Sequence, residues 1–378
     1  MPKIFVCGDI LNRFSDRPFV STKLQQLIKD CDYAVCNFEG VALDNAFSQT
    51  KGLIQHPSTL SHLREAGFDL LLLANNHITD VGEDGVRQTI EKSRNLGFNT
   101  LGAGLFFRDA YQPLVFEKDG ICIGILNLCE AHPGYFKDEN QAYGYAWLGH
   151  PSLPYMIRSL KKRVDRLFIF VHAGLEHYDL PLEEFRVLYR RYCDLGADCV
   201  IGSHPHIAQG IENYNDNLIV YSLGNFFFPR CSSASSDDIE NQSYSLVLNL
   251  GISGKIDYQV IYHGVDNLCV DVLTENRKIN VGDLSSRLLS PVYEHEIRKV
   301  NIQAYEGLVY RLYREALMGT SHTDTVWDSF KFIVCYLFCR KGRYLQTRHY
   351  REKLLLHLTT NETYRFLTQA ALRLKLEQ

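Results

Sequence analysis

Seven polar side chains lie at the ends of apolar segments that are typical of buried strands. They are carboxylates, an amide and imidazoles at five separate strand ends: Asp9, Glu39, Asn76, His77, His172, His204 and His206. Imidazole together with carboxylate suits Zn, Fe, Mn or Ni better than Ca or Mg. The set is too large for one tetrahedral ion, but it suits two ions about 3.5–4 Å apart that share a carboxylate. Such a pair activates water, so the pattern predicts hydrolysis or transfer at phosphorus or carbon.

Alternating strands and helices are needed to bring these side chains together. The apolar patterning predicts strands over residues 3–10, 33–36, 68–74, 121–128, 166–171, 199–202, 244–250 and 255–263, and helices over 21–29, 58–66, 82–96, 152–164 and 182–195. Up to about residue 226 this order predicts βαβ units. Ligands gather at the carboxyl ends of the strands in such folds, so the polar strand ends are expected to meet there.

One strand end carries a second signal. The apolar run 68–74 stops at Asn75-Asn76-His77, and helix-start chemistry follows at once. Asp80 is interpreted as an acidic cap, with Glu83 three residues later. A strand that stops in two amides and a histidine, just before a helix, is expected to deliver polar groups to the edge of the sheet.

A second strand end holds two imidazoles in His204-Pro205-His206. Alternation along a strand would send both imidazoles to the same side of the sheet, and Pro205 would stiffen the link. Glu130 and His132 also follow a strand end and could reach the same edge. Of the two interpretations, we favour a loop hydrogen bond over a place in the site.

Composition bounds the class of protein. The chain has 378 residues, of which 46% are apolar and 22% charged, and this suits one large α/β domain with an appendage. A net charge of −4 gives no reason to expect nucleic-acid binding. Eleven cysteines without a CxxC pair suggest reduced thiols in a cytoplasmic protein. We expect no signal peptide and no transmembrane segment.

The last part of the chain differs from the rest. We predict a first domain over residues 1–282 and a helical extension over 283–378. From residue 340 onward there are nine Lys or Arg against three Glu. Two interpretations stay open for this basic tail: peripheral association with anionic lipid or a polyanion, and a solvated face.

Six short motifs, taken in order, resemble one family. They are Gly8-Asp9, Asn37-Phe38-Glu39-Gly40, Leu73-Ala74-Asn75-Asn76-His77, His172-Ala173-Gly174-Leu175-Glu176, Gly202-Ser203-His204-Pro205-His206 and Tyr221-Ser222-Leu223-Gly224-Asn225-Phe226. This series resembles the capsule-synthesis CapA family, which is named for poly-γ-glutamate capsule proteins and is related to the calcineurin-like metallophosphoesterases. The resemblance covers about residues 3–265 and leaves out the helical tail.

The resemblance implies an α/β fold, a four-layer α/β/β/α metallophosphoesterase-like sandwich with two divalent transition-metal ions (Mn, Fe or Zn). Asp9 would bind one ion, Glu39 would bridge, and Asn76 and His172 would bind the second. His204 and His206 would complete the two sites, one each, and His77 would be the catalytic helper to the leaving group. Glu176 and Asn225 would contact either the metal ligands or the substrate. Lys51 and His177 are weighed as substrate contacts against surface positions.

The sequence departs from the phosphoesterase pattern in its first motif. That pattern has Asp-x-His, whereas Asp9 is followed by Ile10-Leu11. The first ion would then have only Asp9, Glu39 and His206 from the protein. The bridging residue is also a glutamate rather than an aspartate.

Two functions of different classes follow. The first is a metal-dependent hydrolase or transferase of the CapA type in capsule, poly-γ-glutamate or surface-polysaccharide metabolism. Metal-activated water would attack an amide or phosphoester of an anionic polymer or a small-molecule substrate. The alternative is a non-catalytic scaffold subunit of a capsule-polymer synthesis complex. An amide-forming ligase subunit is a weaker third, because the sequence has no P-loop.

Overall fold

The computed structural model describes residues 1–43, 52–231, 234–236, 238–275, 278–318 and 341–376. The chain divides into two compact units. The first comprises Met1–Glu130 and Gly134–Ser290, and the second comprises Ala131–Pro133 and Pro291–Gln378. Lys51, one of the predicted substrate contacts, lies outside the described residues.

The first unit contains two large sheets. In spatial order the first sheet is β16 (Cys269–Val272), β15 (Asp257–Asp266), β14 (Gln242–Asn249), β1 (Lys3–Ile10), β2 (Tyr33–Phe38), β3 (Leu70–Leu72) and β4 (Asn99–Leu101), with β13 (Asn225–Phe227) also pairing with β1. The second sheet is β11 (Ile211–Tyr214), β12 (Asn217–Val220), β10 (Cys199–Ser203), β9 (Arg166–His172), β7 (Ile121–Cys129) and β6 (Leu114–Lys118). A small ribbon pairs β5 (Ala103–Gly104) with β8 (Gly144–Tyr145).

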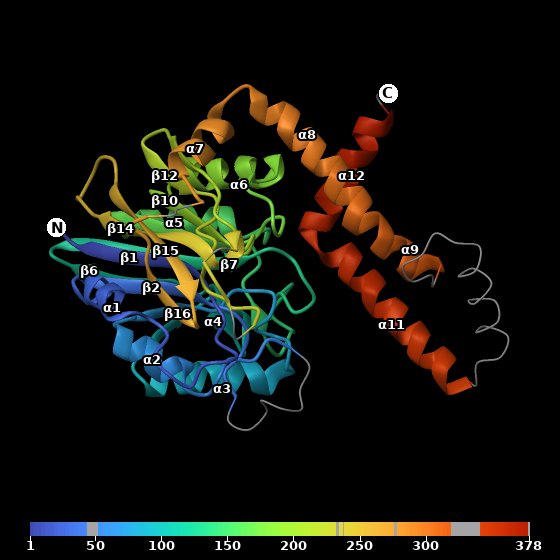
Figure 1. Cartoon of the computed structure of the whole chain (residues 1–378), viewed down its shortest axis with the longest axis horizontal. Coiled ribbons are helices and arrows are strands. Elements are labelled where there is room, and N and C mark those ends of the chain that lie inside the picture. The colour runs from blue at the N-terminus through green and yellow to red at the C-terminus, as the bar shows by residue number, and fades with distance from the viewer. Residues whose placement is uncertain (44–51, 232–233, 237, 276–277, 319–340, 377–378) are drawn as a thin grey trace. The chain divides into compact units, whose positions relative to one another are not determined.

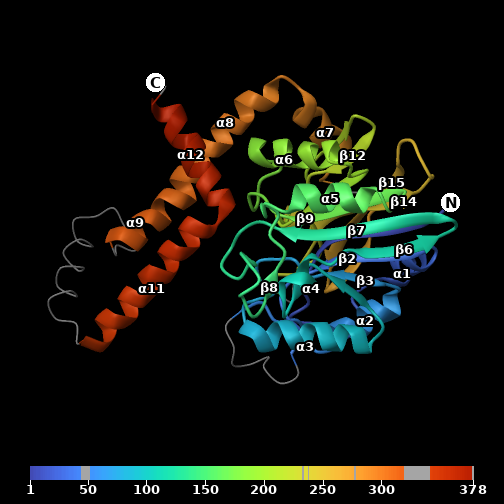
Figure 2. The ribbon, with the colours of Figure 1, turned by 180° about the vertical axis from the view of Figure 1, so that it is seen from behind.

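Helices cover the outer faces of both sheets (Figures 1 and 2). The helices of this unit are α1 (Thr22–Lys29), α2 (Thr59–Ala66), α3 (Gly82–Asn95), α4 (Phe107–Tyr111), α5 (Leu153–Lys161), α6 (Glu183–Asp194) and α7 (Val281–Leu289), with a short 3₁₀ turn at Ile239–Asn241. α1, α2 and α3 lie against the first sheet, and α5 and α6 against the second. The predicted α/β/β/α sandwich is therefore confirmed.

Two buried layers explain why the central strands are apolar without interruption. Along β1, Val6 faces the second sheet and packs in a cluster with Phe168 and Ile201. Phe5, the preceding residue, packs on the other side in the cluster that includes Leu24 of α1. Successive strand residues point to opposite faces, so a strand covered on both faces must be apolar at every position.

Parallel pairing places the strand ends at common edges. β1, β2, β3 and β4 are parallel neighbours in the first sheet. β7, β9, β10 and β12 are parallel neighbours in the second sheet. β13 pairs in parallel with the end of β1, with Asn225 opposite Asp9. The carboxyl ends of β1, β2, β3, β7, β9 and β10 therefore carry the residues that the sequence singled out.

The second unit is helical. It contains α8 (Val292–Ala304), a π-helical turn (Tyr305–Val309), α9 (Tyr310–Met318), α11 (Lys341–Thr360) and α12 (Glu362–Leu376). α8 packs on α12, and α9 packs on α11. On α12 the side chains of Leu367 and Ala371 are fully buried. No helix in the described part of the chain is long and apolar enough to cross a membrane. The predicted boundary between residues 282 and 283 falls inside α7.

A buried histidine in the first unit predicts an acid-sensitive core. His263 lies on β15 with its ring 5.0 Å from that of Phe226, and burial lowers the pKa of His263 to about 3. The unfolded chain protonates this ring near its usual pKa of about 6.5, whereas the folded chain does not. The unfolded state therefore binds more protons below that pH, and stability falls as the pH drops from about 6.5 toward 3.

His263→Phe should remove this acid sensitivity. The free energy of unfolding of the variant, relative to the parent, should rise by up to about 1.4 kcal/mol for each pH unit below about 6.5. Urea unfolding at pH 7, 6 and 5 measures it. The same replacement at exposed His295 is the control and should leave the pH dependence unchanged. Parallel curves for His263→Phe and the parent would contradict the prediction.

Candidate metal centre

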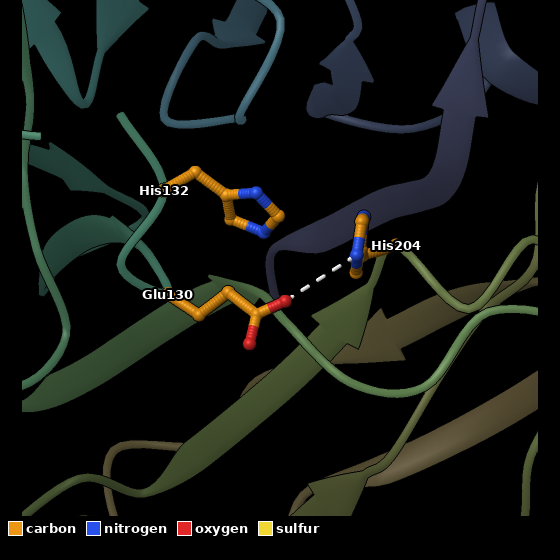
Figure 3. A group of neighbouring side chains, drawn as sticks. All are labelled: Glu130, His132 and His204. Carbon is orange, nitrogen blue, oxygen red and sulfur yellow. Dashed lines mark ion pairs between the residues drawn. The ribbon is translucent and has the colours of Figure 1, made fainter. Parts of the chain in front are cut away.

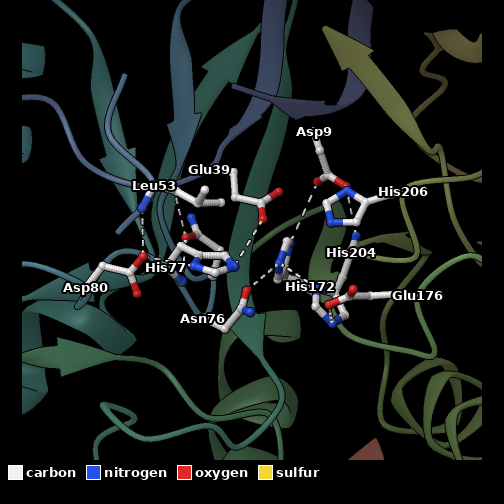
Figure 4. Close-up of polar contacts among 12 residues, drawn as sticks. Asp9, Glu39, Leu53, Asn76, His77, Asp80, His172, Glu176, His204 and His206 are labelled. Carbon is white, nitrogen blue, oxygen red and sulfur yellow. Dashed lines mark hydrogen bonds and ion pairs between the residues drawn. The ribbon is translucent and has the colours of Figure 1, made fainter. Parts of the chain in front are cut away.

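The predicted ligands come from the ends of strands in both sheets and face one another (Figure 4). Asp9 lies near the end of β1, and Glu39 directly follows β2. His172 is the last residue of β9, and His204 directly follows β10. Asn76 lies between β3 and α3. The structure thus brings the side chains from the two sheets to one place.

Asp9 is the fully buried centre of the group. Its Oδ1 accepts a hydrogen bond from Asn37 Nδ2 at 2.7 Å and lies 3.7 Å from His172 Nδ1. Its Oδ2 accepts a hydrogen bond from the His204 backbone N–H at 3.1 Å and lies 3.6 Å from His206 Nδ1. The carboxylate therefore connects three of the predicted histidines.

Glu39 is fully buried, and neither of its carboxylate oxygens has a hydrogen-bond partner among the described residues. His77 Nε2 lies 3.8 Å from Oε1 of Glu39. Burying an ionised carboxylate without a partner costs roughly several kcal/mol unless a cation compensates the charge. Asp9, Glu39 and His172 each offer one ligand atom, and these three atoms lie within 4.8 Å of one another. This orphaned carboxylate and its neighbours fit a metal ion.

A second set of donors has the spacing of ligands on one ion. His172 Nε2 lies 3.1 Å from Asn76 Oδ1 and 3.0 Å from His204 Nδ1. Two ligand atoms on a tetrahedral ion with bonds of 2.0–2.1 Å are about 3.3 Å apart. The three side chains come from separate strand ends, so the fold itself sets this spacing. Their amide and imidazole types fit a transition ion.

The two histidines of the third group adopt unusual backbone conformations. β10 ends at Ser203, and His204 and His206 have positive φ angles of 98° and 62°. The expectation that strand alternation aligns the two imidazoles is therefore wrong, because neither residue is extended. Such conformations cost about 1–3 kcal/mol each for residues other than glycine and cluster at functional sites. Ligand atoms of Glu176, His204 and His206 lie within 4.8 Å of one another.

Burial governs the electrostatics of the centre. It raises the pKa of Asp9 to about 6 and, with the charge of Asp9, raises the pKa of Glu39 well above its usual range. It also lowers the pKa of His206 to about 3. Burial lowers the pKa of His204 as well, but the hydrogen bond and charge of Glu130 lead the opposing effects, and the net change is upward. A bound cation would favour the ionised carboxylates that burial alone disfavours, and it would be held by the neutral form of the imidazoles.

His77 lies at the more exposed side of the group. Its Nδ1 is 3.0 Å from Asp80 Oδ2, and its side chain is 30% exposed. Asp80 does not cap α3, because the N-cap position belongs to Val81 and no side chain caps it. Asp80 instead orients His77 and accepts a hydrogen bond from the Leu53 backbone N–H at 2.8 Å. The His-x-x-Asp spacing was the signal that the cap interpretation missed.

The other predicted substrate contacts surround His206. His206 Nδ1 lies 3.0 Å from Asn225 Oδ1, so Asn225 contacts a predicted ligand directly. Glu176 is exposed, and its Oε1 lies 3.8 Å from His204 Nε2. His177 is also exposed, and its Nδ1 lies 3.0 Å from Glu240 Oε1. The structure brings all three to the edge of the candidate centre.

Sequence reasoning missed two buried amides that support the ligands. Asn37 donates to Asp9 and lies 3.2 Å from His172 Nδ1. Gln55 donates from Nε2 to the backbone oxygens of Ile10 and Glu39 at 2.8 and 2.7 Å. Asn37 begins the motif Asn37-Phe38-Glu39-Gly40, so the sequence did contain a signal for it. Gln55 lies in a segment without a motif, and its role depends on a contact across the fold.

Two curated bacterial proteins are similar to this chain in sequence. The chain is 28% identical over 239 residues to a capsule biosynthesis protein CapA of Bacillus anthracis, covering 61% of this chain and 58% of that protein. It is 30% identical over 210 residues to the PGA biosynthesis protein CapA of Bacillus subtilis, covering 54% and 55% respectively. The chain thus spans little more than half the length of these curated relatives.

A solved 5′-nucleotidase precursor from Thermus thermophilus is also similar, with a TM-score of 0.44, 12% identity, and coverage of 70% of this chain and 54% of that one. At that score the likeness carries no conclusion about function. Residues 3–230 match the sequence model of the family described as "Bacterial capsule synthesis protein PGA_cap". That match covers more than half of the chain and includes the residues of the candidate centre. This protein therefore belongs to the bacterial capsule synthesis protein PGA_cap family.

Proposed function

We propose that this protein is a metal-dependent hydrolase or transferase of the CapA type that acts in poly-γ-glutamate or surface-polysaccharide metabolism. The observation that carries the proposal is Glu39, a buried carboxylate without a hydrogen-bond partner among the described residues, surrounded by imidazoles and a second buried carboxylate. The names of the two Bacillus relatives support a role with a capsule or PGA polymer. The substrate would be an anionic polymer or a smaller anionic precursor.

The donor atoms divide between two ions. Asn76, His172 and His204 would hold one ion, because their donor atoms already have ligand-like spacing. Asp9 and His206 would hold the other, and Glu39 would bridge them. Two bound ions would supply a water of lowered pKa and polarise the scissile bond. The metal would be Mn, Fe or Zn, since the donors are imidazole, amide and carboxylate.

The protein's own acid would be His77. Asp80 holds the Nδ1 side of the ring, which leaves Nε2 directed toward the Glu39 side of the site. A proton kept at Nε2 can then pass to the leaving oxygen or nitrogen of a substrate in the centre. The partial exposure of His77 suits a group that meets substrate rather than a group that binds a buried ion.

His77→Ala tests this assignment. The rate of metal-dependent cleavage should fall by roughly 10²–10⁴-fold, the usual contribution of a general acid, while the metal content stays unchanged. Poly-γ-glutamate and bis(p-nitrophenyl) phosphate, assayed with Mn²⁺, Fe²⁺ or Zn²⁺, serve as substrates. His150→Ala, at a histidine bonded to Ser152 outside the centre, is the control and should retain the parental rate. An unchanged rate in His77→Ala would contradict the role of His77.

One observation favours the scaffold alternative. The residues after Asp9 are Ile10 and Leu11, which are buried and apolar, so the first ion lacks the histidine found in the phosphoesterase pattern. In a scaffold, the double variant Asn76→Ala/His77→Ala would still support polymer synthesis in cells, whereas deletion of residues 291–378 would abolish it. If the protein is an enzyme, the double variant should fail to support polymer synthesis in cells.

A further inference from the structure

Glu130 lies at the same edge as the candidate centre, although no family motif contains it. It directly follows β7, which pairs in parallel with β9 so that Cys129 is opposite His172. The backbone N–H of Glu130 donates to the His172 oxygen at 3.1 Å, and the Glu130 side chain is fully buried. The interpretation of Glu130 as a loop residue with a hydrogen-bonding role does not explain why a carboxylate is buried at this point.

The carboxylate of Glu130 faces one of the predicted ligands (Figure 3). Glu130 Oε1 lies 3.4 Å from His204 Nε2. On the other side of the same ring, His204 Nδ1 lies 3.0 Å from His172 Nε2, within the group that has ligand-like spacing. The two nitrogens of His204 therefore have separate partners: one faces the donors of the centre and the other faces a carboxylate.

This division matches a general requirement of metal sites. An imidazole binds a metal through one nitrogen and usually donates its other N–H to a carboxylate, a carbonyl or water, which sets the tautomer and the ring orientation. Glu176 also approaches His204 Nε2, but at 3.8 Å and from an exposed side chain. Glu130 is closer and fully buried, so it is the stronger partner.

We propose that Glu130 is a positioning residue of the metal centre: it accepts the Nε2–H of His204, so that Nδ1 is directed at the ion that Asn76 and His172 also hold. The proposal rests on the proposed metal centre and adds a residue to it. Glu130 needs no contact with substrate for this role. It sets the affinity of one ion, the ion on the His204 side, and leaves the Asp9 and His206 side nearly unaffected.

Cobalt titration of the full chain measures this role without an activity assay. Metal-free protein is titrated with Co²⁺ in the presence of a competing chelator, and visible absorption reports the coordination of the bound ions. Glu130→Ala should lower the Co²⁺ affinity of the site on the His204 side by about 10–100-fold and change the absorption spectrum of that ion. This is the effect expected when a ligand loses its carboxylate partner. Glu130→Gln retains an acceptor oxygen, so its Co²⁺ affinity should fall less than that of Glu130→Ala.

A double variant tests that Glu130 acts through His204. In the His204→Ala background, Glu130→Ala should cause no additional loss of affinity, because the effects of substituting two residues that act as a unit do not add. The matched control is Glu212→Gln, which changes a buried carboxylate paired with Arg190 and should leave both Co²⁺ affinities unchanged. If Glu130→Ala does not fold, Glu130→Gln and its cobalt spectrum provide the same comparison.

The outcomes separate this proposal from the one on which it rests. Failure of the parent protein to bind Co²⁺ would contradict the metal centre itself. Parental affinities and spectrum in folded Glu130→Ala, with normal uptake by the parent, would overturn only the role of Glu130. The role would also be overturned if Glu130→Ala lowered the Co²⁺ affinity equally in the parent and in the His204→Ala background, since Glu130 would then not act through His204.

Discussion

Glu39→Gln is expected to make the metal-free protein more stable while it abolishes tight binding of the bridged ions. Glu39 is fully buried without a hydrogen-bond partner among the described residues, and burial raises its pKa well above the usual range. An uncharged amide removes the cost of ionising this group. We expect a gain of about 1–3 kcal/mol in the free energy of unfolding at pH 8 with a chelator present. Metal affinity should fall by more than about 100-fold, beyond the loss typical of an outer partner.

Glu212→Gln is the matched control for this result. Glu212 is also a buried carboxylate, but its Oε1 accepts from Arg190 at 2.7 Å and its Oε2 accepts from the Tyr221 hydroxyl at 2.6 Å. Breaking these interactions should destabilise the protein by about 1–3 kcal/mol and leave the metal affinity unchanged. If both variants lost stability in the chelator, Glu39 would not be the uncompensated charge that the structure indicates.

Gly8→Ala should strongly destabilise the fold at the edge of the site. A Cβ atom at Gly8 would lie 1.8 Å from the Gly224 backbone oxygen and 2.9 Å from its carbon. Both atoms belong to the backbone, so relief requires β1 to separate from the segment before β13. We expect a loss of more than about 3 kcal/mol in the free energy of unfolding, or no folded protein.

The damage from Gly8→Ala should reach the metal centre, since the next residue is Asp9. The Asp9 N–H donates to the same Gly224 oxygen at 3.1 Å. Gly120→Ala is the control: Gly120 has a φ of +74° but no atom within 4 Å of the added Cβ. It should cost only about 1–2 kcal/mol and leave the metal content unchanged. Denaturant unfolding with metal analysis compares the two, and similar losses would argue against a backbone clash at Gly8.

Much of the fold could be predicted because its central strands are buried on both faces. Segments such as 121–128 and 166–171 are apolar without interruption, and the structure places strands there at Ile121–Cys129 and Arg166–His172. Their polar ends then identify the edge of the sheets. The sequence could not predict β13, because its pairing with β1 joins residues far apart in the chain through a few backbone contacts. β16 (four residues) and β4 (three residues) were missed because such short segments show too little periodicity.

The residue types of the candidate centre could be predicted more completely than their geometry. Glu39 and His172 follow apolar runs, so their placement depends on local patterning. The left-handed conformations of His204 and His206 have no such local signal, and a strand was the wrong expectation there. The approach of Glu130 to His204 depends on how the three parallel strands β7, β9 and β10 are aligned. Periodicity within one segment contains no information about that alignment.

The number of metal ions bound by the full chain tests the central claim most directly. The protein is loaded with Mn²⁺, Fe²⁺ or Zn²⁺ and passed over a desalting column, and elemental analysis gives the ions per chain. Anomalous scattering from crystals of the same sample then locates them. We predict two ions, one among Asn76, His172 and His204 and the other beside Asp9 and His206, with Glu39 between them. A correctly folded protein that retains no ion at these residues would contradict the account.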